Sequence, residues 1–159
     1  MRKQYVKVEQ SNRHVCFSCE QITYVNPKVV AGCIPMMPDG KVVLLKRDNE
    51  PGRGLWTFPT GFQEMGETVE AAARRETWEE IKTRVRIGSL VGIYSYPDAG
   101  VVTIVYAGFV IGRQKPQSGF EAQAVKRVDP AKINWRSLAF RSTVEALRDW
   151  KKSKRIKQK

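Results

Sequence analysis

Three glutamates near the middle of the chain have a spacing that could do chemistry. Glu76, Glu79 and Glu80 lie in residues 68–82, a stretch without Gly or Pro that predicts a helix with Thr68 as its N-cap. At ~100° per residue the three carboxylates share one helix face, where they repel one another unless a cation compensates. Oxygen ligands at this density suit Mg²⁺ or Mn²⁺. The segment therefore indicates a divalent-cation site.

Two neighbouring residues support a cation site. Arg75 lies four residues before Glu79 and can orient a carboxylate or contact phosphate. Gly61 begins the loop that enters the helix, and its lack of a side chain lets the backbone approach an ion or ligand closely. The alternative is an acidic face exposed to solvent and balanced by nearby cations, namely Arg74, Arg75 and Lys82. The glutamates alone favour this alternative, but the spacing of the whole segment does not.

The spacing of residues 61–83, GFQEMGETVEAAARRETWEEIKT, resembles the Nudix box GX5EX7REUXEEXGU. The box positions that match are Gly61, Glu67, Arg75, Glu76, Glu79 and Glu80. The positions that depart are the final glycine, here Lys82, and the two apolar positions, here Thr77 and Thr83. A lysine at a helix end that favours glycine costs about 1 kcal/mol. No departure removes an acidic residue.

The resemblance extends to a Nudix branch that has an N-terminal zinc ribbon and acts on ADP-ribose, FAD and related dinucleotides. Three segments carry it: residues 26–35 (NPKVVAGCIP), 50–59 (EPGRGLWTFP) and 134–140 (NWRSLAF). The zinc ribbon has two CxxC pairs, whereas this sequence has Cys16 and Cys19, with His14 as a candidate third ligand. Because a structural zinc site needs four ligands, we expect a relic knuckle without Zn²⁺. We expect Cys33 in the core.

The resemblance implies hydrolysis of a nucleoside diphosphate linked to another moiety. Water would attack a phosphorus of the pyrophosphate, and metal ions would stabilise the charge that develops. The implied metal ligands are Glu76, Glu79, Glu80 and the carbonyl oxygen of Gly61. Arg75 would orient a glutamate, and Glu67 would support the loop before the helix.

Two glutamates compete for the role of general base. Some Nudix enzymes use a box glutamate, which is Glu76 here. Dinucleotide-sugar hydrolases can use a later loop, where Glu121 stands in this sequence. The related branch tends to carry a second acid three residues further on, and this chain has Ala124 there. We therefore favour Glu76 and keep Glu121 as the second candidate.

Substrate contacts are expected near residues 47–62, a Gly- and Pro-rich segment that predicts an irregular functional loop. Cations there could meet phosphates, and aromatic rings could stack on adenine or flavin or equally well belong to the core. The expected contacts are Arg47, Arg53, Trp56, Phe58 and Tyr94, and Tyr96 is a further ring that could stack. Pro97 lies fifteen residues after Lys82, the interval at which ADP-ribose pyrophosphatases carry a proline, and residues 95–98 (SYPD) differ from the stretch typical of NADH pyrophosphatases. The resemblance thus implies ADP-ribose or FAD before NADH.

The charge of the chain leaves other functions open. Its 28 Lys+Arg and 16 Asp+Glu give +12, and half of this excess lies in residues 146–159, which hold seven basic residues and one acid. Such a tail is either solvated and frayed or a site for polyanions. One alternative is therefore hydrolysis of capped or 5′-triphosphorylated RNA bound through the tail. Another is a Nudix-fold nucleotide or RNA sensor without turnover, although the intact glutamates argue against it.

Length and composition indicate one globular domain that is not integral to a membrane. The 159 residues are 42% hydrophobic and 28% charged, and no apolar run approaches the ~20 residues that a spanning helix needs. Residues 1–10 are polar and unlike a signal peptide, so we expect a cytoplasmic protein with reduced cysteines.

The pattern of elements predicts an α+β fold. Strands are predicted at 29–35, 41–46, 84–96, 101–111 and 122–128, and helices at 68–82 and 142–150. The resemblance implies a Nudix α/β/α sandwich with a mixed β-sheet, and a homodimer as in many relatives. We divide the chain into an N-terminal segment (1–27), a Nudix domain (28–150) and a basic tail (151–159).

Overall fold

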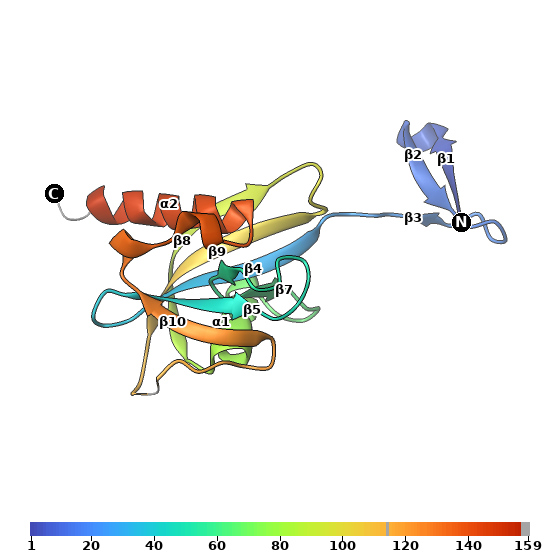
Figure 1. Ribbon diagram of the computed structural model, residues 1–159. Coiled ribbons are helices and arrows are strands. Elements are labelled where there is room, and N and C mark those ends of the chain that lie inside the picture. The colour runs from blue at the N-terminus through green and yellow to red at the C-terminus, as the bar shows by residue number, and fades with distance from the viewer. Residues whose placement is uncertain (114, 157–159) are drawn as a thin grey trace.

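The computed structural model describes residues 1–113 and 115–156, which form a small N-terminal sheet and a larger α/β body (Figure 1). The N-terminal elements are β1 (Arg2–Val6), η1 (Lys7–Glu9), β2 (Ser11–Val15) and β3 (Ile22–Thr23). The three strands pair antiparallel in the order β1-β2-β3. In Figure 1 this sheet stands apart from the body, to which an extended stretch connects it. The expected polar segment thus forms a sheet of its own.

The body is built on a seven-stranded sheet whose main path is β10-β5-β4-β9-β8. These strands are β4 (Lys28–Met36), β5 (Val42–Arg47), β8 (Val85–Ser95), β9 (Val101–Val110) and β10 (Ala122–Val128). β4 and β9 run parallel, and the other neighbours on the path run antiparallel. The predicted irregular loop contains two short strands, β6 (Trp56–Thr57) beside β5 and β7 (Thr60–Phe62) beside β4. The mixed sheet confirms the predicted fold class.

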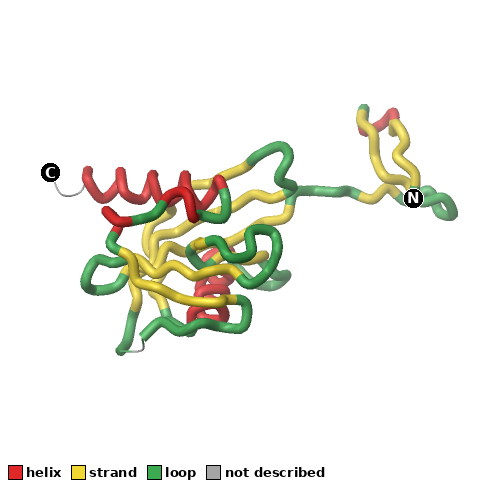
Figure 2. Tube along the Cα trace, in the orientation of Figure 1, coloured by secondary structure: helices red, strands yellow, loops and turns green. Residues whose placement is uncertain are grey.

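Two helices cover the two faces of this sheet (Figure 2). The helical elements of the body are α1 (Val69–Ile81), η2 (Pro130–Lys132), η3 (Trp135–Ser137) and α2 (Arg141–Ile156). Successive residues of a strand point to opposite faces. In β4, Cys33 shares a buried cluster with Ala72 of α1, whereas Ile34 shares one with Leu147 of α2. This alternation confirms the α/β/α sandwich and the core position of Cys33.

Helix α2 extends further than the sequence predicts. The predicted helix ends at residue 150 and gives way to a tail, but α2 begins at Arg141 and runs through Ile156. Trp150 is buried against the sheet, and Lys151 Nζ donates to the carbonyl oxygen of Pro130 at 2.7 Å. These contacts continue the helix into the basic segment, of which residues 157–159 lie outside the described part. Neither α2 nor any other described helix is long and apolar enough to cross a membrane.

Candidate active site

Helix α1 carries the three glutamates and begins where the sequence predicts. The Thr68 hydroxyl oxygen accepts a hydrogen bond from the Ala71 N–H at 3.1 Å, as an N-cap does. At the other end Lys82 has φ 50°, in the left-handed region where glycine is favoured. Thr77, at an apolar position of the box, is fully buried and donates to the Ala73 carbonyl oxygen at 2.6 Å. The helix therefore accommodates the departures from the box.

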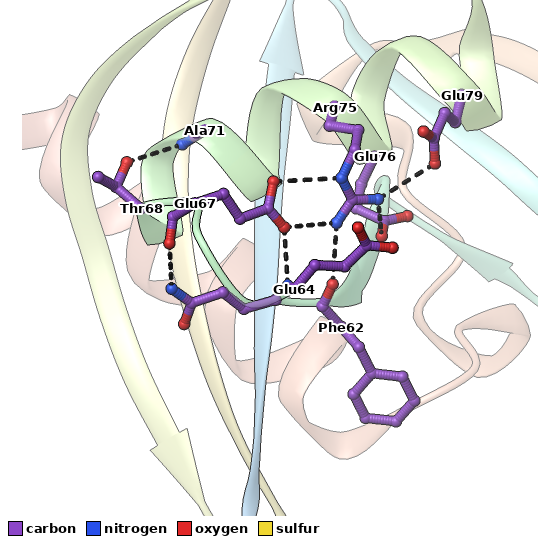
Figure 3. Close-up of polar contacts among 9 residues, drawn as sticks. Phe62, Glu64, Glu67, Thr68, Ala71, Arg75, Glu76 and Glu79 are labelled. Carbon is purple, nitrogen blue, oxygen red and sulfur yellow. Dashed lines mark hydrogen bonds and ion pairs between the residues drawn. The ribbon is translucent and has the colours of Figure 1, made fainter.

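A single guanidinium connects the carboxylates of this region (Figure 3). Arg75 Nη1 lies 2.7 Å from Glu76 Oε1 and 3.2 Å from Glu79 Oε2. Its Nε and Nη2 grip the Glu67 carboxylate at 3.2 and 2.7 Å, and Nη2 also donates to the Phe62 carbonyl oxygen at 3.0 Å. Arg75 thus ties the helix glutamates to the loop that precedes the helix.

Glu67 in turn fixes that loop. Its carboxylate accepts from the Glu64 N–H at 2.8 Å, and its carbonyl oxygen accepts from Gln63 Nε2 at 2.7 Å (Figure 3). The hydrogen bonds from Arg75 lower the pKa of Glu67, so its charge is kept in the folded protein. Glu67 therefore positions the loop, and its carboxylate is already hydrogen-bonded to Arg75 and to the Glu64 N–H.

Gly61 lies directly against the carboxylate of Glu76. A Cβ at position 61 would collide with both carboxylate oxygens and the carboxylate carbon of Glu76. The backbone of Gly61 is held in β7 by pairing with Ala31 of β4, so it cannot easily withdraw. A larger residue at this position would therefore displace the Glu76 carboxylate, so glycine is favoured here because of close approach and not because of its φ angle.

Glu80 is a buried carboxyl group. Only 4% of the residue is exposed, and its carboxylate accepts a hydrogen bond from the Thr60 N–H at 2.8 Å. Burial raises the pKa of Glu80 to about 8; the charges of Glu76 and Glu121 act in the same direction, and the Thr60 hydrogen bond opposes them. Burial also raises the pKa of Glu76. The site thus holds carboxylates whose charge is not balanced by the protein alone.

The raised pKa of Glu80 predicts how the stability of the metal-free protein depends on pH. The group titrates near 8 in the folded state and near its usual 4.5 when unfolded. Between these values the folded state binds more protons, so stability falls as pH rises. We expect the Tm in EDTA to decline from pH 5 to pH 8, and the slope to flatten in Glu80→Gln but not in Glu64→Gln, an exposed control. A wild-type Tm that is constant over this range would contradict the buried state of Glu80.

The loop after β9 brings another carboxylate to the end of α1. The Gly119 N–H donates to the Glu80 carbonyl oxygen at 2.8 Å. The Gln117 N–H donates to the carbonyl oxygen of Ile81, the last residue of α1, at 3.0 Å. A Cβ on Gly119 would overlap the backbone carbonyl of Glu79. The loop is therefore seated on the helix end, and Glu121 reaches the same cavity as the helix glutamates.

The cavity has a volume of about 960 Å³ and two kinds of lining. What we call the acidic wall consists of Glu64, Glu76, Glu79, Glu80 and Glu121. What we call the aromatic lining consists of the rings of Phe58, Tyr96 and Phe140, together with two arginines close to them, Arg47 and Arg141. The Arg47 guanidinium lies 4.9 Å from the centre of the Phe140 ring, and that of Arg141 lies 4.5 Å from the centre of the Tyr96 ring. One end of a ligand could thus meet carboxylates while another meets rings and cations.

Of the five expected substrate contacts, Arg47 and Phe58 line the cavity and three lie elsewhere. Arg53 is exposed and pairs with Asp48 at 3.3 Å. Trp56 packs beside the core under the Lys126 ammonium, 3.6 Å from the ring centre. Tyr94 is buried and donates from its hydroxyl to the Asp149 carboxylate at 3.1 Å. These three side chains contact other residues of the chain and do not line the cavity. Their role as substrate contacts stays a prediction.

Besides Tyr96, which the sequence analysis names as a ring that could stack, the structure adds lining residues that were not selected as sites. Tyr96 and Phe140 line the cavity with Arg141, and Phe120, which is almost fully exposed, lines it beside the acidic wall. The signals available were weak: Phe140 ends the segment NWRSLAF, and Gly119 precedes Phe120 and Glu121. Neither signal indicates a cavity without the tertiary fold.

Cys16 and Cys19 lie in the turn between β2 and β3, away from the cavity. Cys16 Sγ is 3.2 Å from Ser18 Oγ, and hydrogen bonds with this hydroxyl, the backbone of Cys19 and Ser18 and the Cys19 side chain together lower the pKa of the Cys16 thiol to about 6. In the described part of the chain no third histidine, cysteine or carboxylate joins the pair to form a metal-binding group. Loss of zinc binding here stays a prediction.

The acidic wall fits a divalent cation by its chemistry, although two of its carboxylates are already paired with Arg75. Among the residues described, no three acidic, histidine or cysteine side chains converge closely enough to enclose an ion. Arg75 pairs with two of the three helix glutamates, Glu76 and Glu79. Hard oxygen donors, the burial of Glu80 and mutual repulsion nevertheless suit Mg²⁺ or Mn²⁺. Binding would require one or both paired carboxylates to turn from Arg75 toward the ion.

Comparisons with known proteins agree on one family. The family model described as NUDIX domain matches residues 26–149. An ADP-ribose pyrophosphatase of Methanocaldococcus jannaschii is 42% identical over 93 residues, 56% of this chain and 54% of that protein. The NAD-capped RNA hydrolase NudC of Chromobacterium violaceum is 31% identical over 115 residues, 72% of this chain and 42% of that protein. The chain thus spans about half the length of these curated relatives.

A solved structure covers more of the chain. The crystal structure of a NUDIX hydrolase from Nitrosomonas europaea has a TM-score of 0.85 and 36% sequence identity, and the match covers 91% of this chain and 81% of that one. The shared fold therefore includes most of the body described above.

Proposed function

The chain belongs to the NUDIX domain family, and from this premise we propose that it is a metal-dependent pyrophosphatase acting on a nucleoside diphosphate linked to a second group, such as ADP-ribose or FAD. The acidic wall is the observation that carries the proposal. Buried Glu80 lies among further carboxylates in a cavity that also has aromatic and cationic lining. A module that only binds nucleotides has no need of such a repulsive cluster.

The proposed metal ligands are Glu76, Glu79 and Glu80, together with the carbonyl oxygen of Gly61. When bound, Mg²⁺ or Mn²⁺ would neutralise pyrophosphate oxygens and stabilise the charge that develops at the broken P–O bond. Glu80 must lose its proton to bind a cation, so the ion would replace that proton near neutral pH. Arg75 would release one or both of Glu76 and Glu79 to the cation while remaining anchored on Glu67.

For the general base we propose Glu76, with Glu121 as the alternative. Burial raises the pKa of Glu76, and a base is more effective when its pKa approaches the working pH. Glu121 is exposed on its loop, and its carboxylate has no ion pair or hydrogen bond to another described side chain. It could therefore move toward a bound substrate, which keeps it in consideration.

The aromatic lining is the proposed site for the nucleoside. Tyr96 and Phe140 offer ring surfaces for adenine or flavin, and Arg141 and Arg47 lie over these two rings, whereas Phe58 is buried. Guanidinium groups held in this way can also meet phosphate oxygens. A volume of about 960 Å³ is at the upper end of the ~300–1,000 Å³ usual for small-molecule sites, which suits a dinucleotide.

A substrate panel tests the proposal directly. With Mg²⁺ or Mn²⁺ the purified protein should release AMP from ADP-ribose or FAD with kcat in the ordinary range of roughly 1–10³ s⁻¹, and EDTA should abolish the release. NADH and nucleotide sugars in the same chromatographic assay measure selectivity. Absence of turnover on all of these substrates with either ion would refute the proposed function.

A further inference from the structure

We propose that the outer face of α2 binds the phosphate backbone of a single-stranded RNA whose 5′ end enters the cavity. We call Arg141, Arg148 and Lys152 the α2 stripe. The placement of the 5′ end rests on the proposed function, whereas the binding of the strand does not. In Figure 1, α2 lies along the outside of the body, and no other element is drawn over its outer side.

The three cations of the stripe follow one line along the helix. Seven residues make nearly two turns at ~100° each, so Arg148 falls behind Arg141, and Lys152 follows one turn later. With a rise of ~1.5 Å per residue the stripe is roughly 16 Å long. The side chains of Arg141 and Lys152 are 74% and 75% exposed. At ~3.4 Å per stacked nucleotide, this length matches about five phosphates.

The stripe begins at the mouth of the proposed active site. Arg141, its first member, lines the cavity together with Tyr96 and Phe140. Arg148 and Lys152, its other members, lie within residues 146–159, which carry seven basic residues and one acid. A polyanion bound along the stripe is thereby led to the cavity.

Two acids lie between the cations of the stripe in sequence, and each accepts a hydrogen bond from a tyrosine hydroxyl. The Glu145 carboxylate accepts from the Tyr96 hydroxyl at 2.5 Å, and the Asp149 carboxylate accepts from the Tyr94 hydroxyl at 3.1 Å. Both tyrosines belong to β8 or the turn after it, beneath the helix. The acids pair sideways with Arg141 and Lys152, and Arg148 has no ion pair with a described residue. Residues 141–153 carry four cations and these two acids, so this part of the helix has a net positive charge.

Two guanidinium groups of the stripe are also held in position. Arg141 lies over the Tyr96 ring and Arg148 over the Trp135 ring, with distances of 4.5 and 5.5 Å to the ring centres. Lys151 approaches the same Trp135 ring at 5.4 Å. Cations that are already ordered lose less entropy when they bind phosphates. A linear, ordered row of cations that starts at a nucleotide-sized cavity suits a nucleic-acid strand better than a flat membrane surface.

Binding of a fluorescein-labelled, 12-nucleotide single-stranded RNA with a 5′-phosphate tests the stripe. Anisotropy is measured for the full chain in EDTA over a range of salt. The test variant is Arg148→Glu with Lys152→Glu; the charge-matched control is Arg86→Glu with Arg127→Glu, on the edge strands. We expect the test variant to lose at least about tenfold in affinity and its log–log salt slope to fall by about 1.4, since each phosphate contact contributes ~0.7. The control should stay within twofold of the wild type.

Further readouts separate the two proposals. ADP-ribose turnover should be unchanged in the test variant, because neither Arg148 nor Lys152 lines the cavity. If the wild type cleaves no dinucleotide, the proposed function fails while the RNA titration still decides the stripe. Equal losses in test and control variants, or tighter binding to phosphatidylserine vesicles than to RNA, would overturn the stripe. RNA binding that excess ADP-ribose does not weaken would overturn the placement of the 5′ end.

Discussion

Glu79→Gln is expected to lower kcat for AMP release about 10³-fold, because a metal ligand contributes several kcal/mol to stabilising the transition state and ~4 kcal/mol corresponds to this factor. The Glu79 side chain is 53% exposed, and its recorded ion pair is the one with Arg75 at 3.2 Å. The amide removes the charge and leaves the shape, so the free energy of unfolding should change little. Steady-state kinetics on ADP-ribose, with a parallel urea titration, measures both effects.

The matched control for this substitution is Glu70→Gln. Glu70 lies on the same helix, but its carboxylate accepts a hydrogen bond from the Tyr106 hydroxyl at 2.9 Å and does not line the cavity. Its activity should remain near that of the wild type. If Glu79→Gln keeps more than a tenth of the activity at saturating Mg²⁺, Glu79 is not a metal ligand. A rise in the Mg²⁺ concentration needed for half-maximal activity would locate the effect at the ion.

Features of the site that depend on local spacing could be predicted from the sequence. Glu76, Glu79 and Glu80 share a helix face because of the helical period, and Thr68 caps that helix as its type and position indicate. Gly61 and Glu76 are far apart in sequence, but β7 and the loop before α1 bring them into contact. This contact is implied by the resemblance of the whole segment to the Nudix box. Their roles in catalysis remain proposals.

The aromatic residues show where such prediction ends. Tyr94 and Tyr96 are two residues apart and point to the same side of the chain, toward α2. Tyr94, inside β8, is covered by the helix, whereas Tyr96, just past the strand, lies where the helix begins and reaches the cavity. The distinction depends on where β8 ends relative to α2. No composition or period within the strand encodes this relation.

The residue at which α2 ends could likewise not be predicted from the sequence. Residues 151–156 are mostly basic, and repulsion among like charges favours a frayed tail when they are considered alone. The burial of Trp150 and the hydrogen bond from Lys151 to the Pro130 carbonyl oxygen supply stabilisation from distant parts of the chain. Tertiary contacts of this kind can override local helix preference.

Gly119→Ala is expected to reduce kcat/KM up to about 10²-fold and to lower the free energy of unfolding by about 1–3 kcal/mol. The new Cβ would overlap the Glu79 carbonyl group, so the loop would have to lift from the end of α1. The hydrogen bond from the Gly119 N–H to the Glu80 carbonyl oxygen would be lost, and Glu121 would move away from the acidic wall. Urea denaturation and ADP-ribose kinetics measure the two effects.

Two further variants identify the origin of that loss. Ser118→Ala changes the exposed neighbouring residue and should leave stability and kinetics near those of the wild type. If the loss arises because Glu121 is displaced, Glu121→Gln should lower kcat/KM by a similar factor, and the double variant with Gly119→Ala should be little worse than either single one. An additive double variant would assign the loss to the helix end that carries Glu79 and Glu80. Wild-type behaviour of Gly119→Ala would show that the loop is not seated on α1, because no alanine fits where the structure places this glycine.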